Sequence, residues 1–191
     1  VEARNLATGQ TFVVKEISTF SFSPDARFIA MTRYAAEGKK TSEVLVQDLA
    51  KGTRLPFANV GEQAWADRGS LLALTIDTDG GAGNGVQLYD AATGVVRVLE
   101  SSTNQYRGLA WRPKSTDLAV LGTRVDTAFT DTAHVLLAWR TVAVAQGVTL
   151  SLDPAANAAF PTGLRIADSR RPSWSTDARI VYIGLRKREP K

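Results

Sequence analysis

The sequence contains no cysteine and only one histidine among its 191 residues. Without cysteine there is no disulfide framework, no thiolate zinc site and no cysteine nucleophile. His134 alone cannot form a two-histidine metal site, and it is the one candidate for a histidine general base. We therefore predict no metal and no cofactor.

Long apolar segments are also missing. No run of about 18 apolar residues occurs, and Val1 does not open a basic region followed by an apolar one, as a signal peptide would. We expect no segment that spans a membrane or anchors to one. With 44% hydrophobic and 22% charged residues, the composition is that of an ordinary globular protein and excludes disorder.

Excess positive charge is confined to one part of the chain. The net charge is +4, and residues 162–191 hold eight Lys or Arg against Asp168, Asp177 and Glu189. Nucleic-acid-binding proteins usually spread basic residues over a face that also carries aromatic side chains. Here the excess is largely one run, residues 186–188, which we interpret as a solvated chain end. The sequence predicts no nucleic-acid partner.

One short pattern occurs four times: an aromatic residue, a polar turn and an apolar strand. The segments align without gaps and begin at the anchor residues Phe22, Trp65, Trp111 and Trp174. Each is typical of a β-hairpin, with second strands expected at residues 27–33, 70–76, 118–121 and 180–185. We expect the four anchors in equivalent buried positions.

A second motif alternates with these hairpins. It reads Asn-Leu-Ala-Thr-Gly at residues 5–9, Asp-Leu-Ala-Lys-Gly at residues 48–52 and Asp-Ala-Ala-Thr-Gly at residues 90–94. The first side chain caps local N–H groups, while glycine adopts positive φ to close the turn. Each period therefore contains two hairpins and four strands.

Four strands in a period of 43 to 46 residues are typical of a propeller blade. The fold class is predicted as all-β, with about four blades' worth of four-stranded antiparallel sheets in one domain over residues 1–191. The first and last repeats each supply half a blade, so we expect a fragment of a larger propeller. The alternative is a small propeller closed by joining the two half-blades. Unpaired strand edges would favour edge-mediated self-association.

The last interval between anchors is longer than the others, at 63 residues. It predicts an insertion at about residues 140–170. Within it, Asp153 is a suitable helix N-cap, Pro154 suits the first helical position, and alanines follow up to Phe160. We therefore expect one short helix at residues 153–160, as a decoration of a blade.

No residue is predicted to be catalytic. The pentapeptide G-x-S-x-G of a nucleophile elbow does not occur. His134 lies in an apolar strand-like run and is interpreted as a structural histidine. The aspartates at positions 25, 67 and 177 recur in one turn and those at 48 and 90 in the other, so their recurrence has a structural cause.

The loop from Asp77 to Gly85 is rich in aspartate and glycine. A phosphate-binding loop should lead into a helix, but the residues after Gly85 predict a strand. A calcium loop would need a later bidentate glutamate, which is missing. We interpret the loop as a connection between inner and outer strands, with calcium as the alternative. Residues 126–131 are the equivalent loop one blade later.

The repeats Phe22-Ser-Pro-Asp-Ala-Arg-Phe-Ile-Ala and Trp174-Ser-Thr-Asp-Ala-Arg-Ile-Val-Tyr resemble blades of TolB-like and dipeptidyl peptidase-like propellers. The Gly-His and Trp-Asp signature of WD repeats is absent. Together with Ala64-Trp-Ala-Asp-Arg-Gly-Ser-Leu-Leu-Ala73, these segments most resemble the N-terminal propeller of bacterial prolyl oligopeptidase-family serine peptidases. The resemblance covers nearly the whole chain.

That resemblance implies a non-catalytic role. In such peptidases the propeller caps an α/β-hydrolase domain of the same parent chain and gates the access of peptide substrates. The paired glutamates with which dipeptidyl peptidases bind the substrate amino terminus are absent here. The alternative is a TolB-like or WD-like protein-interaction scaffold without enzymatic activity. The resemblance favours a periplasmic or secreted protein over a cytoplasmic one.

Overall fold

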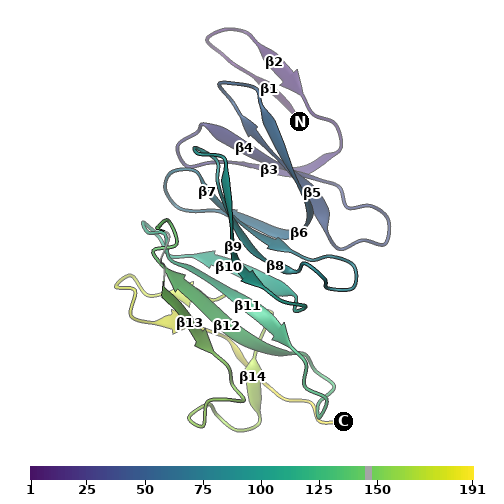
Figure 1. The fold of residues 1–191 in the computed structure, drawn as a ribbon, viewed down its shortest axis with the longest axis vertical. Coiled ribbons are helices and arrows are strands. Elements are labelled where there is room, and N and C mark those ends of the chain that lie inside the picture. The colour runs from purple at the N-terminus through teal and green to yellow at the C-terminus, as the bar shows by residue number, and fades with distance from the viewer. Residues whose placement is uncertain (145–147) are drawn as a thin grey trace.

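The structure, a computed structural model, describes the fold of residues 1–144 and 148–191. The regular elements of these residues are all β-strands, and the strand pairs are antiparallel. The sheets follow one another as a row from the N-terminus to the C-terminus (Figure 1). This confirms the all-β class. The described part of the chain also has no helix long and apolar enough to cross a bilayer.

Three blades have four strands each. The first contains β3 (Ile17–Phe22), β4 (Phe28–Arg33), β5 (Ser42–Asp48) and the beginning of β6 (Arg54–Trp65). The second contains the end of β6, β7 (Leu71–Ile76), β8 (Gly85–Asp90) and β9 (Val95–Ser101). The third contains β10 (Tyr106–Trp111), β11 (Leu118–Arg124), β12 (Ala133–Arg140) and β13 (Val148–Leu152). The predicted four-stranded blade is confirmed.

Strand β6 belongs to two blades. Residues 54–57 pair with β5, and residues 62–65 pair with β7. Between these segments Asn59 adopts a φ of 56°, and the register shifts between Val60 and Glu62. A bulge of this kind bends a strand and increases its twist. The first two blades therefore form one continuous seven-stranded sheet, from β3 to β9.

Half a blade lies at each end of the row. Strands β1 (Glu2–Arg4) and β2 (Thr11–Val13) form one hairpin. At the other end, β14 (Leu164–Ile166) pairs with β17 (Leu185–Lys187), and β15 (Ser173–Trp174) pairs with β16 (Val181–Tyr182). No ladder among the described residues joins the two ends. The row is open, as expected for part of a propeller.

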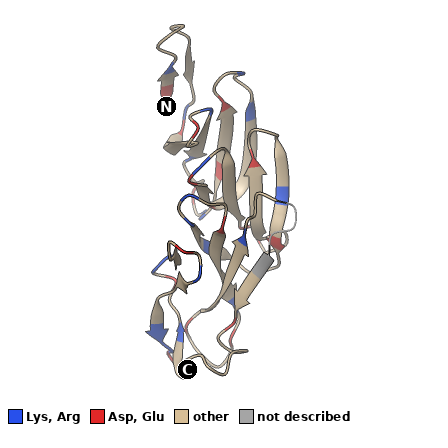
Figure 2. Cartoon of the chain, turned by 90° about the vertical axis from the view of Figure 1, so that its left-hand side faces the viewer, with Lys and Arg blue, Asp and Glu red and all other residues tan. Residues whose placement is uncertain are grey.

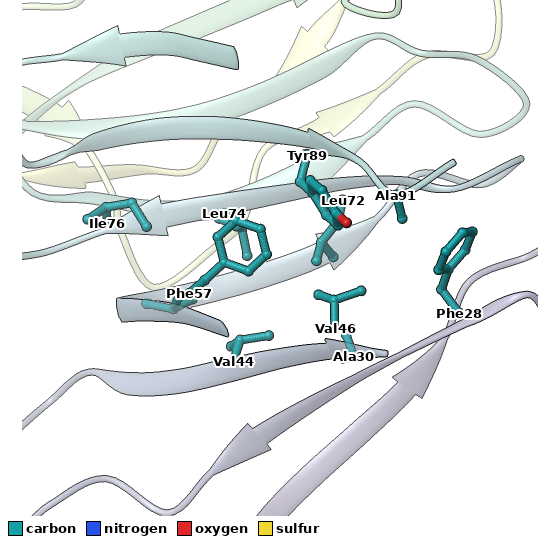
Figure 3. Packing of buried hydrophobic residues seen from close by; sticks show 11 residues of the cluster. Phe28, Ala30, Val44, Val46, Phe57, Leu72, Leu74, Ile76, Tyr89 and Ala91 are labelled. Atoms are coloured by element: carbon teal, nitrogen blue, oxygen red, sulfur yellow. The ribbon is translucent and has the colours of Figure 1, made fainter. Parts of the chain in front are cut away.

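The core consists of apolar layers between neighbouring blades. In the layer between the first two blades, Phe57 meets Tyr89 with ring centroids 5.0 Å apart (Figure 3). The alternate residues Val44 and Val46 of β5 and Leu72 and Leu74 of β7 are buried in the same layer. Similar layers lie between the second and third blades and between the third blade and the last strands. Stability therefore depends on blade-to-blade packing.

The tryptophan anchors make the same contact in successive blades. Trp65 Nε1 donates to the carbonyl of Ser21 at 3.3 Å, and Trp111 Nε1 to that of Ala64 at 2.9 Å. Trp174 Nε1 donates to the carbonyl of Ala110 at 3.0 Å. Each acceptor directly precedes the anchor of the preceding blade. The expected equivalence of these three positions is confirmed, although each side chain is half-buried.

Phe22 is an exception to the expected burial. It occupies the anchor position of the first blade, but 50% of it is exposed. Its ring has no N–H group to donate, and it contacts the neighbouring exposed Phe20 edge-on at 6.0 Å. The prediction of burial was wrong for Phe22, because the layer that would cover it requires a complete preceding blade.

The turns have the predicted chemistry. Oδ1 of Asp48 accepts the N–H groups of Ala50 and Lys51, and Gly52 closes the turn with a φ of 73°. Asn5 and Asp90 cap equivalent turns. Positive φ is costly for residues with a Cβ atom, so glycine at the closing position favours this turn.

The helix predicted at residues 153–160 does not form. Instead, Asp153 Oδ1 accepts the N–H of Ala155, and Asn157 Oδ1 accepts the N–H of Ala159. The backbone forms two successive turns, closed at Ala156 and Phe160. The Asn157 side chain offers the backbone a local partner that competes with helix continuation. The predicted insertion interval also includes β13, the fourth strand of the third blade, and residues 145–147, which lie outside the described residues.

Candidate functional site

The first strands of neighbouring blades lie against one another, β6 against β10 and β10 against β15. They therefore form the inner edge of the row, which faces the channel in a closed propeller. A bulge interrupts the pairing of this strand in every complete blade: at residue 18 in β3, at 61 in β6 and at 108–109 in β10. β-bulges often lie beside functional sites.

The innermost strand of the last half-blade is formed by β14 and β15, and its pairing has a much larger interruption. Strands β14 and β15 face β17 and β16, and residues 167–172 lie between them opposite residues 183–184. The N–H of Ala167 donates to the carbonyl of Gly184 at 2.9 Å, which anchors the start of this segment. We call residues 167–172 the inner bulge. Its sequence, Ala-Asp-Ser-Arg-Arg-Pro, places three charged residues on the inner edge.

The inner bulge packs on the bulge of β10. Gly108 has a φ of 74°, and a Cβ atom there would lie 3.3 Å from Cδ of Pro172. The N–H groups of Gly108 and Leu109 donate to the carboxylate of Glu62 at 2.9 to 3.1 Å. The Glu62 carboxylate thus satisfies backbone groups that the bulge removes from the ladder. Its role is structural.

Guanidinium groups surround this contact. Arg171 Nη2 lies 3.8 Å from Glu62 Oε2, and the Arg171 side chain is 68% exposed. Arg107 Nη1 lies 3.0 Å from Asp168 Oδ2. Arg170 is also exposed. Arginine presents five donors and is suited to bind carboxylate or carbonyl oxygens. The inner bulge is therefore a candidate site for an anionic or peptide group.

A buried cluster of ion pairs contacts the inner bulge. Asp131, in the loop between β11 and β12, accepts ion pairs from Arg165 Nε at 3.3 Å and Arg188 Nε at 3.0 Å. Asp131 also accepts the N–H of Glu189 at 2.7 Å. Arg165 Nη1 lies 3.6 Å from Asp168 Oδ1, which connects the cluster to the inner bulge. Figure 2 shows the Lys and Arg residues near the C-terminus.

His134 is buried beside this cluster. Only 1% of it is exposed, and neither ring nitrogen has a hydrogen-bond partner in the part of the chain that the structure describes. It lines a cavity of about 20 Å³ together with charged side chains of neighbouring segments: Arg124, Asp126, Asp153, Arg165 and Arg188. A polar cavity of this size has room for about one water molecule. Among the described residues, no hydroxyl is hydrogen-bonded to either nitrogen, and the structural role of His134 stays a prediction.

The ionisation of this region follows from burial and charge. Burial lowers the pKa of the His134 imidazole, because the charged form loses hydration. Burial alone would raise the pKa of Asp168. A backbone N–H and the positive groups of Arg107 and Arg165 outweigh that effect and lower its pKa.

We expect stability to fall as the pH drops below about 6.5, the ordinary pKa of histidine. The unfolded chain then binds a proton that the folded protein excludes, with a slope of at most about 1.4 kcal/mol per pH unit. The carboxylate of Asp168 contributes a separate loss, below about pH 4. Urea unfolding at about pH 7.5 and 5.5 measures the first loss, and His134→Gln should abolish it. Equal pH dependence of both proteins would contradict this assignment.

The other residues considered from the sequence have structural contacts. Asp67 Oδ2 accepts the N–H of Lys114 in the next blade at 2.7 Å. Ser23 Oγ donates to Asp25 Oδ1 at 2.5 Å, and Ser175 Oγ donates to Asp177 Oδ1 at 2.6 Å in the equivalent turn. Asp25 and Asp177 hold the turns of their own hairpins, as predicted, whereas Asp67 contacts the turn of the next blade.

The loop at residues 77–85 connects β7 to β8, as predicted. Asn84 is buried, and its Oδ1 accepts the N–H of Thr78 at 2.6 Å. Asp77 Oδ2 accepts a hydrogen bond from Gln105, and Asp79 pairs with Lys39 at 2.5 Å. Throughout the described residues, no group of three His, Asp or Glu side chains is placed to hold a metal ion. The equivalent loop one blade later connects β11 to β12 and contributes Asp131 to the ion cluster.

Sequence reasoning did not find the inner bulge. One signal was present: the pair Arg170-Arg171 lies directly before Pro172 and the Trp174 anchor, where the other repeats have part of an alternating strand. This interruption of the alternating pattern indicated that the chain leaves the regular strand at this point. The partners Glu62 and Asp131, however, lie far away in the sequence.

No protein-family model and no curated protein matches the chain. Among solved structures, hydrazine synthase of Kuenenia stuttgartiensis is 18% identical, with a TM-score of 0.55, and the match covers 97% of this chain and 55% of that one. The β-propeller domain of the trilobed protease of Pyrococcus furiosus is 17% identical, with a TM-score of 0.53 and coverages of 86% and 49%. The tricorn protease is 11% identical, with a TM-score of 0.51 and coverages of 98% and 19%.

These similarities establish the β-propeller fold. The chain spans about half the length of the first two structures. The neighbours include a propeller domain of a protease and also a protein of different activity. The fold alone is therefore compatible with several functions.

Proposed function

We propose that this chain is the propeller portion of a prolyl oligopeptidase-type serine peptidase. In this role it caps an α/β-hydrolase domain of the same parent chain and gates the access of peptides. The observation that carries the proposal is the inner bulge, which places exposed Arg170 and Arg171 on the edge that faces the channel of a closed propeller. Guanidinium groups there can bind the carbonyl oxygens or carboxylate of a passing peptide.

The placement of the single histidine is consistent with a non-catalytic role of this chain. Acyl transfer by a serine needs a base within hydrogen-bond reach of the hydroxyl. The single histidine is buried, and no described residue accepts or donates a hydrogen bond at either of its nitrogens. A hydrolase domain elsewhere in the parent chain would have to supply the nucleophile.

A fluorophosphonate probe tests whether the reactive serine lies outside residues 1–191. We expect no serine within residues 1–191 to react, because none is activated. In the parent polypeptide, we expect one serine outside this segment to be labelled. Stoichiometric labelling at a serine of the segment, identified by mass spectrometry, would contradict the proposal, as would a parent polypeptide that the probe leaves unmodified.

The proposed gating of peptide access can be tested in the same parent protein. Arg171→Glu should change kcat/KM for long peptides more than for a minimal ester substrate, because only the former pass the inner bulge. Arg179→Glu is a matched control, since Arg179 lies in the turn between β15 and β16, outside the inner bulge, and its side chain is 84% exposed. Equal effects of both variants on both substrates would argue against a role of the inner bulge in gating.

The second candidate is a protein-interaction scaffold without enzymatic activity. It is favoured by the apolar side chains that the open row exposes, which include Phe20, Phe22 and Tyr182. Exposed apolar patches mark interaction surfaces in soluble proteins. Absence of any probe-reactive serine from the parent polypeptide would favour this candidate.

A further inference from the structure

Buried polar atoms that lack a hydrogen-bond partner are concentrated at one place in this protein. Five such side-chain atoms occur among the described residues, and four of them belong to His134, Arg165 and Arg188. In folded proteins about nine-tenths of buried polar groups have a partner, and a group without one indicates a bound water molecule or ion. The cavity that these three residues line is therefore a candidate binding site.

The three residues reach the cavity from separate elements. His134 lies on β12 and pairs with Thr123 of β11. Arg165 lies on β14, which lies against β12, and Arg188 directly follows β17. A ligand in this cavity would therefore contact the third blade and the last strands at the same time.

Two of these side chains are deeply buried. His134 is 1% exposed and Arg165 is 7% exposed. Burial lowers the pKa of His134, so the imidazole is neutral at about pH 7.5 and presents one N–H donor and one acceptor nitrogen. Arg165 Nε lies 3.3 Å from Asp131 Oδ2, but its N–H is not aligned with that oxygen. This N–H therefore needs another acceptor.

The guanidinium group of Arg188 is held in place by contacts on several sides. Nη1 donates to Asp126 Oδ2 at 2.9 Å, and Nε donates to Asp131 Oδ1 at 3.0 Å. Cζ of Arg188 also lies 3.6 Å from the centroid of the Phe129 ring. These contacts use two of the three guanidinium nitrogens. The third, Nη2, is buried with two N–H groups and no partner in the described part of the chain.

The hydrogen-bonding groups at this cavity favour an anion over a water molecule. Arg165 Nε and Arg188 Nη2 together carry three N–H groups, and neutral His134 adds one N–H and one acceptor nitrogen. A water molecule accepts about two hydrogen bonds and brings two donors that need acceptors of their own. An anion accepts from all of these N–H groups and brings no donor.

The charged side chains of the cavity wall favour an anion as well. Arg124, Arg165 and Arg188 line the cavity, against the carboxylates of Asp126 and Asp153. Each of these carboxylates already accepts a backbone N–H and pairs with an arginine. The wall therefore carries more positive than negative charge, and its carboxylates have their own partners.

The volume of the cavity limits the anion to a single atom. The cavity measures about 20 Å³, which is room for about one water molecule. Carboxylate, phosphate and sulfate groups contain several heavy atoms and need more space. The ion pair between Arg124 and Asp153 forms part of the wall, and these side chains are 40% and 33% exposed. Opening of this exposed ion pair would let a small ion exchange with solvent.

We propose that this cavity binds one chloride ion, held by the N–H groups of His134, Arg165 and Arg188. The ion connects β12 of the third blade to β14 and to the residue after β17, and it stabilises the packing of the last strands on the third blade. The inference rests on contacts among residues 124–188 and does not depend on the proposed peptidase function.

Urea unfolding of the purified protein at about pH 7.5 tests for the ion. Chloride is exchanged for gluconate at constant ionic strength, so that the screening of surface charges stays the same. If chloride binds only the folded protein, the unfolding equilibrium constant should fall about tenfold for each tenfold rise of chloride above its dissociation constant. Bromide should act in the same way. An unfolding constant that does not respond to chloride would overturn the proposal.

Two variants test whether this cavity is the binding site. His134→Leu keeps a side chain of similar size but removes the N–H, so it should raise the chloride dissociation constant at least about tenfold. Gln63→Leu is the matched control, because it removes the fifth unpartnered buried atom, which lies on β6 outside the cavity wall. It should leave the chloride dependence unchanged. The same chloride dependence in both variants would contradict the assignment of the site.

Crystals of the protein grown in bromide give a measurement that does not depend on unfolding. Anomalous diffraction should locate a bromide ion in the cavity, within hydrogen-bonding distance of Arg165 Nε and Arg188 Nη2. A water molecule at that place, or a cavity without an anomalous signal, would overturn the proposal.

Discussion

Replacing Trp65 with alanine should lower the free energy of unfolding by about 3 to 5 kcal/mol, the usual cost of truncating a large aromatic residue in a core. The indole packs against the layer between the first two blades. It also donates its N–H to the carbonyl of Ser21, which the truncation leaves without this donor. Urea unfolding monitored by circular dichroism measures the change.

Two further variants separate packing from hydrogen bonding. Trp65→Phe keeps most of the apolar contact and removes the donor, so it should cost about 1 kcal/mol beyond its smaller volume. Phe22→Ala alters the same position of a blade whose anchor is half exposed, and it should cost less than about 1 kcal/mol. Similar costs for Trp65→Ala and Phe22→Ala would show that the anchors do not hold the blades together.

Replacing Asp131 with alanine should destabilise the protein by about 3 to 5 kcal/mol. Its side chain is 4% exposed and faces Arg165 and Arg188, which are 9% and 12% exposed. Removal of the carboxylate takes away the buried counter-charge that the two guanidinium groups share, and leaves them only the more exposed carboxylates of Asp168 and Asp126. Strand β14, which carries Arg165, and strand β17, which Arg188 directly follows, should therefore detach from the third blade first, and hydrogen exchange of Ile166 and Leu185 would detect this.

Asp79→Ala is the matched control for this variant. Asp79 lies in the equivalent loop one blade earlier and also pairs with a basic residue, Lys39. The Asp79 side chain is 86% exposed, and an exposed ion pair contributes at most about 1 kcal/mol. If both alanine variants had the same small effect, the cluster around Asp131 would not stabilise the last strands.

Most of the fold could be predicted because its signals are local. The Asn or Asp and Gly of each outer turn act within five residues, and alternating apolar residues reveal a strand that is buried on its faces. The repetition of these signals every 43 to 46 residues identified the blade. The turn contacts of Asp48 and the strand pairs beside it agree with that prediction.

The errors arose where the outcome depends on more distant groups. Residues 153–160 have a helical N-cap and alanines, but Asn157 caps a second turn instead of continuing a helix. Phe22 occupies the same position of the repeat as Trp65, but its exposure depends on whether a complete preceding blade covers it. Neither result can be read from local residue preferences.

The sequence by itself determined the hairpins, the order of the blades and the absence of a second histidine or any cysteine, since each depends on residue type and local spacing. The tertiary structure alone decided which charges meet. Glu62, Arg107 and Arg171 come from three different blades, and Asp131 meets Arg188 across 57 positions of the chain. Such contacts depend on how one blade packs on the next, and charge attraction acts through space whatever the separation in sequence.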